Sequence, residues 1–138
     1  MKYRLIILMA VGTIFILGVI SLVDVVPPLA ITRTAITEAF ARIHLYAQLS
    51  NKIPESLDIL PKREGYANCT TDGWKRNLQY SVDSDGIISL KSFGKDGLPG
   101  GSGDDADIEV RYRTRDTEGR SIIADPMWTV TGELLERP

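Results

Sequence analysis

The stretch SFGKDGLPGGSGDDADI, residues 92–108, concentrates the side chains of this chain that could do chemistry. It holds four aspartates and five glycines, so carboxylates alternate with positions where the backbone can turn freely. Ca²⁺ takes six to eight oxygen ligands from carboxylates and backbone carbonyls. The residues alone leave two interpretations open: a cage for a hard cation, or a solvated acidic loop.

Asp96, Asp105 and Asp107 could converge on one ion if the glycine-rich middle of the stretch folds back on itself. Asp105 and Asp107 are two residues apart, so an extended segment would point both side chains the same way. Asp104 would then face away or reach round the edge, and nearby backbone oxygens could complete the shell. The spacing does not fit an EF-hand loop. The candidate ligands are Phe93 (through its carbonyl oxygen), Asp96, Ser102, Asp104, Asp105 and Asp107.

Other chemistries find little support in the composition. The chain has a single histidine, His44, and a single cysteine, Cys69, which cannot make a zinc site or a catalytic triad. The formal charge of −2 argues against nucleic acid, because phosphate binding needs a basic patch. We therefore expect no enzymatic activity, no nucleic-acid partner and no small-molecule substrate.

Residues 5–23 form an apolar run without a charge or a proline. As a helix this run would be about 30 Å long, close to the hydrocarbon thickness of a bilayer. Lys2 and Arg4 precede it, which favours a cytoplasmic N-terminus. A cleaved secretory signal is the alternative, but no A-x-A pattern follows the run. We expect a single-pass anchor over residues 1–28 and an exported head over residues 29–138.

The exported part begins with a helical pattern over residues 29–50. Ile36, Phe40, Ile43 and Ala47 recur at spacings of four, three and four, which predicts one apolar stripe. Pro54 follows as a stop signal. This segment is the expected spine helix of the head.

Strand patterns follow the helix. They predict strands over residues 78–82, 86–93 and 108–115, with a hairpin turn at 83–86 and a return strand at 121–125. We expect Trp74 to anchor the sheet on the helix, whereas the segment around Trp128 has weak signals. The predicted fold class is α+β and pilin-like: a long N-terminal membrane-spanning and spine helix, a small antiparallel sheet head, and a C-terminal metal-binding loop. Sheet and loop together are expected over residues 72–125.

Residues 92–108 resemble the C-terminal signature of the major (G-type) pseudopilin of type II secretion systems, S-L-G-x-D-G-x-x-G-G-x-x-x-D-A-D-I. The preceding segment is similar to that family's D-P-W-G-x-x-Y-x-Y stretch, with Asp72, Trp74, Leu78 and Tyr80 on its positions. The likeness covers nearly all of residues 14–108, and the acidic loop is its most specific part.

This resemblance implies a type IV pilin-like subunit that assembles into a short periplasmic pseudopilus supporting protein export. It places the chain in the bacterial inner membrane with its head in the periplasm, in contact with copies of itself, other pseudopilins and secretion-apparatus proteins. It also implies Ca²⁺ in the loop. The family's side-chain ligand positions fall on Asp96, Asp105 and Asp107, its carbonyl ligand falls on Phe93, and Asp104 is a further candidate.

The chain departs from the family at both ends. No glycine precedes the apolar run where prepilin peptidase would cut, and no acid occurs within residues 5–23. Residues 109–138 extend beyond the family's usual end. We therefore expect an uncleaved, divergent member. The alternative is a non-polymerising, membrane-anchored periplasmic adaptor or binding module with a pilin-like head.

Overall fold

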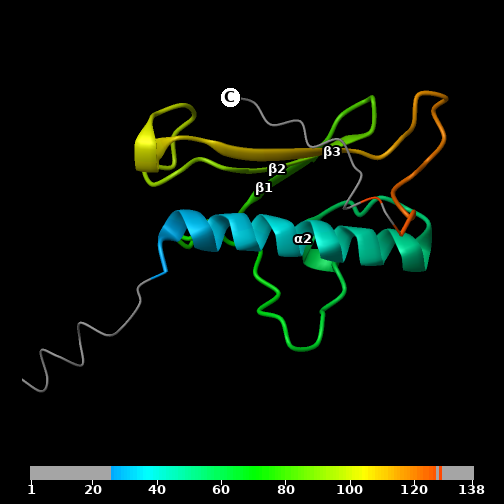
Figure 1. Cartoon of the computed structure of the whole chain (residues 1–138), viewed down its shortest axis with the longest axis horizontal. Helices are drawn as coiled ribbons and strands as arrows, with labels where there is room; N and C mark the ends of the chain where they lie inside the picture. The colour runs from blue at the N-terminus through cyan, green and yellow to red at the C-terminus, as the bar shows by residue number, and fades with distance from the viewer. Residues whose placement is uncertain (1–25, 127, 129–138) are drawn as a thin grey trace, which may run out of the picture.

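A computed structural model of the chain describes residues 26–126 and residue 128. It is an α+β structure in which one long helix lies across one face of a small antiparallel sheet (Figure 1). The elements in chain order are helix α2 (Pro28–Ser50), the 3₁₀ helix η1 (Leu57–Ile59), strands β1 (Gln79–Val82) and β2 (Ile87–Ser92), the 3₁₀ helix η2 (Gly103–Asp105) and strand β3 (Ile108–Arg113).

Helix α2 confirms the spine helix expected over residues 29–50. Pro28 occupies its first turn, where proline needs no hydrogen-bond donor, and the Pro27 carbonyl accepts the amides of Ala30 and Ile31. The helix ends at Asn51, which has a left-handed φ of 55° and donates its amide to the Ala47 carbonyl at 2.7 Å. Asparagine tolerates this conformation better than most residues, so the sequence itself stops the helix there.

The sheet has the strand order β1-β2-β3, with both pairs antiparallel. The turn between β1 and β2 is held by the Asp83 carboxylate, which accepts the amides of Asp85 and Ile87 at 3.0 and 2.8 Å. Gly86 supplies the positive φ of 74° that this turn requires. The three predicted strands and the predicted hairpin turn are therefore confirmed, with ends that differ by one or two residues.

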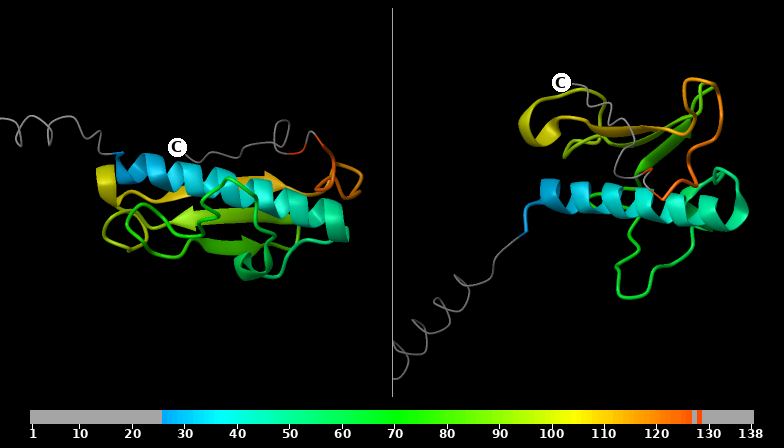
Figure 2. Two further views of the ribbon diagram at one scale, coloured as in Figure 1. Left: turned by 90° about the horizontal axis from the view of Figure 1, so that it is seen from below. Right: turned by 45° about the vertical axis from the view of Figure 1, so that its right-hand side comes forward.

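The core lies between α2 and the sheet. The right-hand view of Figure 2 shows the helix running along one face of the sheet. The predicted helical stripe is confirmed, because Ile36, Phe40, Ile43 and Ala47 are all 2% exposed or less. They face the alternate β2 residues, among which Leu90 is fully buried. Burying one such side chain contributes roughly 1.5–3 kcal/mol, so this contact is the main force that seats the helix on the sheet.

Two predictions for the C-terminal part were wrong. Residues 121–125 do not form a return strand; only an isolated bridge joins Arg115 to Ser121. The aromatic anchor is Trp128 rather than Trp74, since the Trp128 side chain is 1% exposed and Trp74 stays outside the core. Trp128 was missed because one buried aromatic in a turn-rich segment produces no periodic pattern.

The predicted anchor over residues 1–28 lies almost wholly outside the described residues, and the apolar run 5–23 lies entirely outside them. Within residues 26–126 and 128, no helix has the length and hydropathy needed to cross a bilayer.

Candidate metal centre

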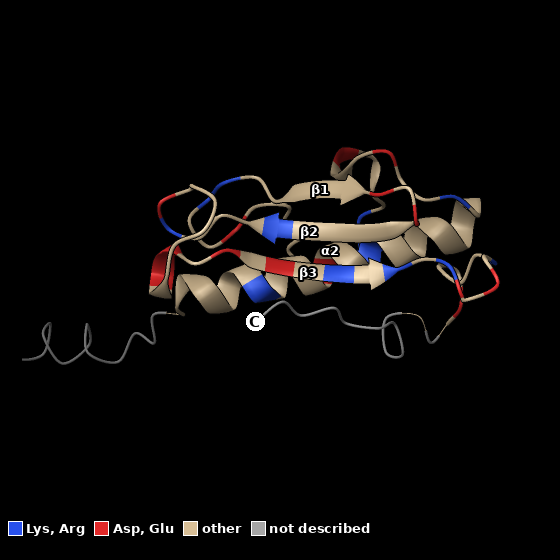
Figure 3. Cartoon of the chain, turned by 90° about the horizontal axis from the view of Figure 1, so that it is seen from above, with Lys and Arg blue, Asp and Glu red and all other residues tan. Residues whose placement is uncertain are grey.

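The acidic loop, residues 93–107, connects β2 to β3 at the end of the sheet that lies beside the start of α2 (Figure 1). Its acidic residues gather at this end of the molecule, around η2 (Figure 3). Positive φ angles at five glycines of the loop let the chain turn repeatedly within fifteen residues. The loop is therefore folded on itself rather than extended.

Backbone hydrogen bonds close the loop at three points. The Lys95 amide donates to the Asp104 carbonyl at 2.8 Å, and the Gly97 amide donates to the Phe93 carbonyl at 3.1 Å. Near the other end, the Asp107 amide donates to the Gly100 carbonyl at 3.2 Å. Because a carbonyl oxygen has two lone pairs, Phe93 still has one available for a cation.

Two glycines allow separate segments of the loop to approach each other. A Cβ at Gly94 would lie 2.6 Å from the Asp105 carbonyl oxygen, and a Cβ at Gly101 would lie 2.5 Å from the same oxygen. Neither contact is possible for a residue with a side chain. The glycines thus bring Asp105 beside the first and middle parts of the loop, and the fold-back on which the convergence of the acids depended is present.

Asp107 is the acid with the most unusual surroundings. Its Oδ2 lies 3.1 Å from the Lys91 Nζ, while its Oδ1 is buried and has no hydrogen-bond partner in the described part of the chain. A buried carboxylate oxygen without a donor or a cation loses its hydration without compensation. This oxygen is the site in the loop where an added cation would be most favourable.

The remaining candidates are more open. Asp96 Oδ1 accepts the Leu98 amide at 3.0 Å, and Asp96, Ser102 and Asp104 are exposed. Asp105 closes the 3₁₀ turn η2, so the extended segment from which Asp105 and Asp107 would both point the same way is not formed at Asp105. No three His, Cys, Asp or Glu side chains in residues 26–126 and 128 are grouped to hold a metal.

The donor set still suits a hard cation. The loop offers carboxylate and carbonyl oxygens only, which favour Ca²⁺ or Mg²⁺ over softer metals. The orphaned Asp107 oxygen and the close approach at Gly94 and Gly101 both fit such an ion. Chemically, these oxygens can bind a cation and so order the loop, and the charged nitrogen beside them, the Lys91 Nζ, lies 3.1 Å from the Asp107 Oδ2.

Sequence analysis gave no role to the residues that brace this loop. Asp72 is 4% exposed, and its Oδ2 accepts a hydrogen bond from the Ser92 hydroxyl at 2.7 Å, directly before the loop begins. The Arg76 Nη1 donates to the Lys95 carbonyl inside the loop at 2.9 Å. The available signal was the Asp-to-Arg spacing in DGWKR, which suits a turn closed by its own side chains.

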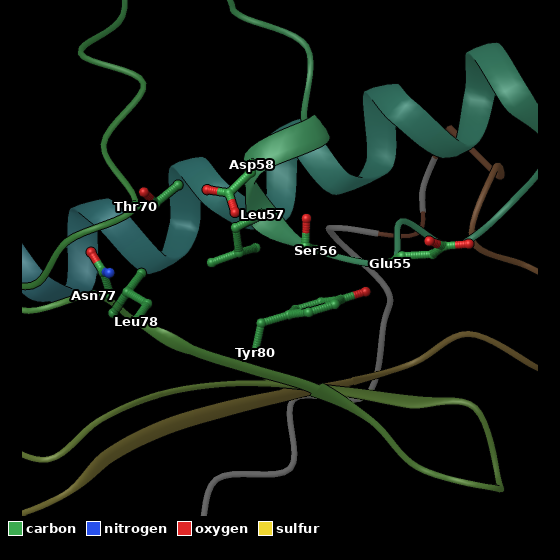
Figure 4. Close-up of a pocket in the computed structure, with 8 residues that line it drawn as sticks. All are labelled: Glu55, Ser56, Leu57, Asp58, Thr70, Asn77, Leu78 and Tyr80. Atoms are coloured by element: carbon green, nitrogen blue, oxygen red, sulfur yellow. The ribbon is translucent and has the colours of Figure 1, made fainter.

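Apart from the acidic loop, a hollow of about 230 Å³ opens between the η1 segment and β1 (Figure 4). Leu57, Leu78 and Tyr80 line it, with Glu55 and Asp58 also contributing. The Tyr80 hydroxyl donates to the Pro54 carbonyl at 2.7 Å, and burial raises the pKa of Tyr80 to about 12. The hollow is smaller than the roughly 300–1,000 Å³ of common ligand pockets, and its tyrosine is committed to holding a loop.

Comparison with known families gives a match over the region just described. No curated protein matches the chain. The family model for type II secretion system (T2SS), protein G matches residues 33–111, more than half of the chain. The match includes most of α2, β1, β2, the acidic loop and the first part of β3. The chain therefore belongs to the type II secretion system protein G family, the major pseudopilins.

Proposed function

We propose that this chain is a structural, pseudopilin-like subunit of a type II secretion or type IV pilus-like apparatus, whose acidic loop is stabilised by Ca²⁺ and which supports protein export. The family is a component of the secretion apparatus and assembles with other pseudopilins. The match spans both the spine helix and the sheet, the two parts that a pilin-like subunit needs. In this role the protein packs and assembles, and it catalyses nothing.

The single observation that carries the calcium proposal is the buried, unpartnered Oδ1 of Asp107 within a loop closed by glycine contacts. Lys91 compensates the other oxygen of this carboxylate. A bound Ca²⁺ supplies positive charge that compensates the carboxylates. The residues that would hold it are Phe93 (carbonyl oxygen), Asp96, Ser102, Asp104, Asp105 and Asp107.

The proposed location is the bacterial inner membrane. Residues 1–28 anchor the chain as a single pass, with the N-terminus cytoplasmic and the head periplasmic. The apolar run 5–23 and the basic residues before it support this placement. The partners are then other copies of this chain, other pseudopilins and proteins of the secretion apparatus.

One observation favours a second candidate function, a non-polymerising membrane-anchored adaptor. Residues 5–23 contain no acid. Acids inside membrane segments are costly and are retained for function, and in the family an acid in this segment helps to pack the next subunit into the filament. A chain without that acid fits an adaptor that does not polymerise. Crosslinking in native membranes separates the two functions. A ladder of homotypic products supports assembly, whereas one defined heterotypic product supports the adaptor.

Calorimetric titration of Ca²⁺ into the full-length chain in detergent tests the metal centre, with Mg²⁺ as the control ion. Suppose the ion binds only the folded loop and is present at 100 times its Kd. It then stabilises the protein by about 2.7 kcal/mol, which raises Tm by on the order of 10 °C. We expect saturable binding and this rise in Tm. Absence of both in the unaltered protein would remove calcium from the proposal.

Two double variants sharpen that test. Asp105→Ala/Asp107→Ala should abolish binding and the calcium-dependent rise in Tm. Asp58→Ala/Asp85→Ala removes the same formal charge from exposed positions outside the loop and should leave both unchanged. If the two double variants lost Ca²⁺ binding and the rise in Tm to the same extent, binding would depend on the net charge of the protein and not on a defined site.

A further inference from the structure

We propose that the Asp72 turn, residues 72–76, couples the acidic loop to the first turns of α2. A cation in the loop then orders the N-terminal end of α2, the end nearest residues 1–25. This inference deepens the proposed function and rests on it. The turn, the loop and the helix start lie at the same end of the head (Figure 1). Three sets of contacts carry the argument.

The first set makes the turn rigid. The Asp72 Oδ1 accepts the amides of Trp74 and Arg76, both at 2.9 Å. The backbone closes in parallel, since the Asp72 amide donates to the Arg76 carbonyl at 2.7 Å and the Lys75 amide donates to the Asp72 carbonyl at 3.0 Å. Lys75 is held at a φ of +65°, an unfavourable angle for lysine that the surrounding bonds maintain.

The second set joins the turn to the loop. The Ser92 hydroxyl donates to the Asp72 Oδ2 at 2.7 Å, and Ser92 directly precedes the candidate carbonyl ligand Phe93. The Arg76 Nη1 donates to the Lys95 carbonyl at 2.9 Å, and Lys95 directly precedes the candidate ligand Asp96. The turn therefore holds the chain just before each of the first two candidate ligands.

The third set joins the turn to the helix. The Gly73 amide donates to the Thr32 Oγ1 at 2.9 Å, and the same hydroxyl donates to the Pro28 carbonyl at 2.9 Å. Thr32 is completely buried. A Cβ at Gly73 would lie 2.0 Å from the Pro28 carbonyl oxygen, so the turn rests directly on the first turn of α2.

These contacts form one continuous polar chain from the Lys95 carbonyl to the Pro28 carbonyl. Its central carboxylate, Asp72, is buried and also lies 3.6 Å from the Arg76 Nε, so losing either Ser92 or the turn amides would remove part of what compensates its burial. Such a network favours states in which all of its members are in place. Coupling between two sites is reciprocal in free energy, so if a cation in the loop favours the ordered helix start, the ordered helix start favours cation binding by the same factor. Removing the contact between them should therefore weaken cation binding.

Thr32→Val tests the coupling, because valine keeps the shape and removes the hydroxyl that joins Gly73 to Pro28. The matched control is Thr34→Val. The Thr34 hydroxyl makes the same bond one turn back, to the Ala30 carbonyl at 3.0 Å, but Thr34 is exposed. Both variants are made in the full-length chain in detergent, and Tm confirms folding.

Two readouts are compared: the Kd for Ca²⁺ and the amide hydrogen exchange of residues 29–33 with and without Ca²⁺. In the unaltered chain, Ca²⁺ should slow exchange in this first helical segment. Thr32→Val should raise the Kd about fivefold or more, the lower end of common couplings between sites, and should remove the effect of Ca²⁺ on exchange. Thr34→Val should match the unaltered chain in both.

Ser92→Ala breaks the same path at its loop end and gives a second, independent test if Thr32→Val does not fold. It should also remove the effect of Ca²⁺ on exchange at residues 29–33. If the unaltered chain binds Ca²⁺ but exchange there does not change, or if Thr32→Val keeps the original Kd, the coupling is refuted and the metal centre stands. If the unaltered chain binds no Ca²⁺, both the coupling and the calcium proposal fail.

Discussion

The acidic loop (residues 93–107) and the C-terminal segment (residues 114–126 and 128) lie toward opposite ends of the sheet and are held by different forces (Figure 1). The loop is held by backbone hydrogen bonds and contributes no side chain to the core of the described chain. The C-terminal segment contributes Ile123 and Trp128, both 1% exposed. The family match includes the loop and stops before the segment.

This difference separates two sources of stability. Apolar burial needs no ion, so the C-terminal segment should hold equally well with or without Ca²⁺. The loop gathers four aspartates, whose mutual repulsion opposes its closure and which a cation would offset. Ile123 and Trp128, which lie beyond the family match, are therefore an integral part of the core of this head. The acidic loop is the region that the calcium proposal expects to depend on solution conditions.

Trp128→Ala should have the largest effect. Trp128 lies 5.2 Å from the Tyr112 ring and 5.9 Å from the His44 ring, and its Nε1 donates to the Arg113 carbonyl at 2.6 Å. Removing a buried tryptophan costs about 3–5 kcal/mol of unfolding free energy. Urea denaturation should show this loss equally in Ca²⁺ and in EDTA.

The control for that variant is Trp74→Ala. Trp74 is only partly buried, with the Arg76 guanidinium 5.9 Å from its ring centre, so its removal should cost much less. A loss at Trp128 that disappeared in EDTA would contradict the separation of the two regions, since it would make the segment dependent on the ion.

Gly101→Ala should have an intermediate effect confined to the loop. The added Cβ would meet the Asp105 carbonyl oxygen at 2.5 Å, and Gly101 has a φ of +83°. Gly100→Ala is the matched control, because Gly100 also has a positive φ, +98°, but has nothing within 4 Å. Left-handed strain costs of order 1–3 kcal/mol at either position, and only Gly101→Ala adds a clash. Calorimetry should therefore show a larger loss of Ca²⁺ affinity for Gly101→Ala; equal losses would mean that the approach to Asp105 is irrelevant to binding.

The sequence predicted the helix and the three strands because periodicity reports one buried face directly. Ile36, Phe40 and Ile43 repeat at helical spacing, and the Asp-Gly turn before β2 marks the hairpin. Trp128 was not predictable in this way. Its burial depends on the path of residues 114–126, which is set by turns and by a single bridge at Arg115 rather than by a repeating pattern.

For the candidate site, composition predicted the loop, and tertiary contacts decide its geometry. The glycine-rich middle of the loop made a fold-back possible, but only the structure shows that Gly94 and Gly101 both approach Asp105. The DGWKR spacing signals the Asp72 turn, but the contact of that turn with the loop could not be predicted, because its partner Ser92 is twenty residues away and both types are common in turns. The ligand set of the loop stays a prediction.

Tyr112→Phe should have the smallest effect at neutral pH and a diagnostic one in alkali. Burial raises the pKa of Tyr112 above its usual value near 10, so the unfolded chain loses this proton first and the unfolded state is increasingly favoured from about pH 10 upward. Burial acts in the same direction at Tyr80, whose pKa of about 12 sets a window of roughly pH 10–12. Urea midpoints measured across this range should fall less steeply in Tyr112→Phe than in the unaltered chain.

Tyr66→Phe, at a 54% exposed position, should keep the full slope, and so should Asp105→Ala/Asp107→Ala, because the loop takes no part in this titration. If the urea midpoints of Asp105→Ala/Asp107→Ala fell less steeply with pH instead, the alkaline sensitivity would lie in the acidic loop. The loop and the C-terminal segment would then unfold as one unit.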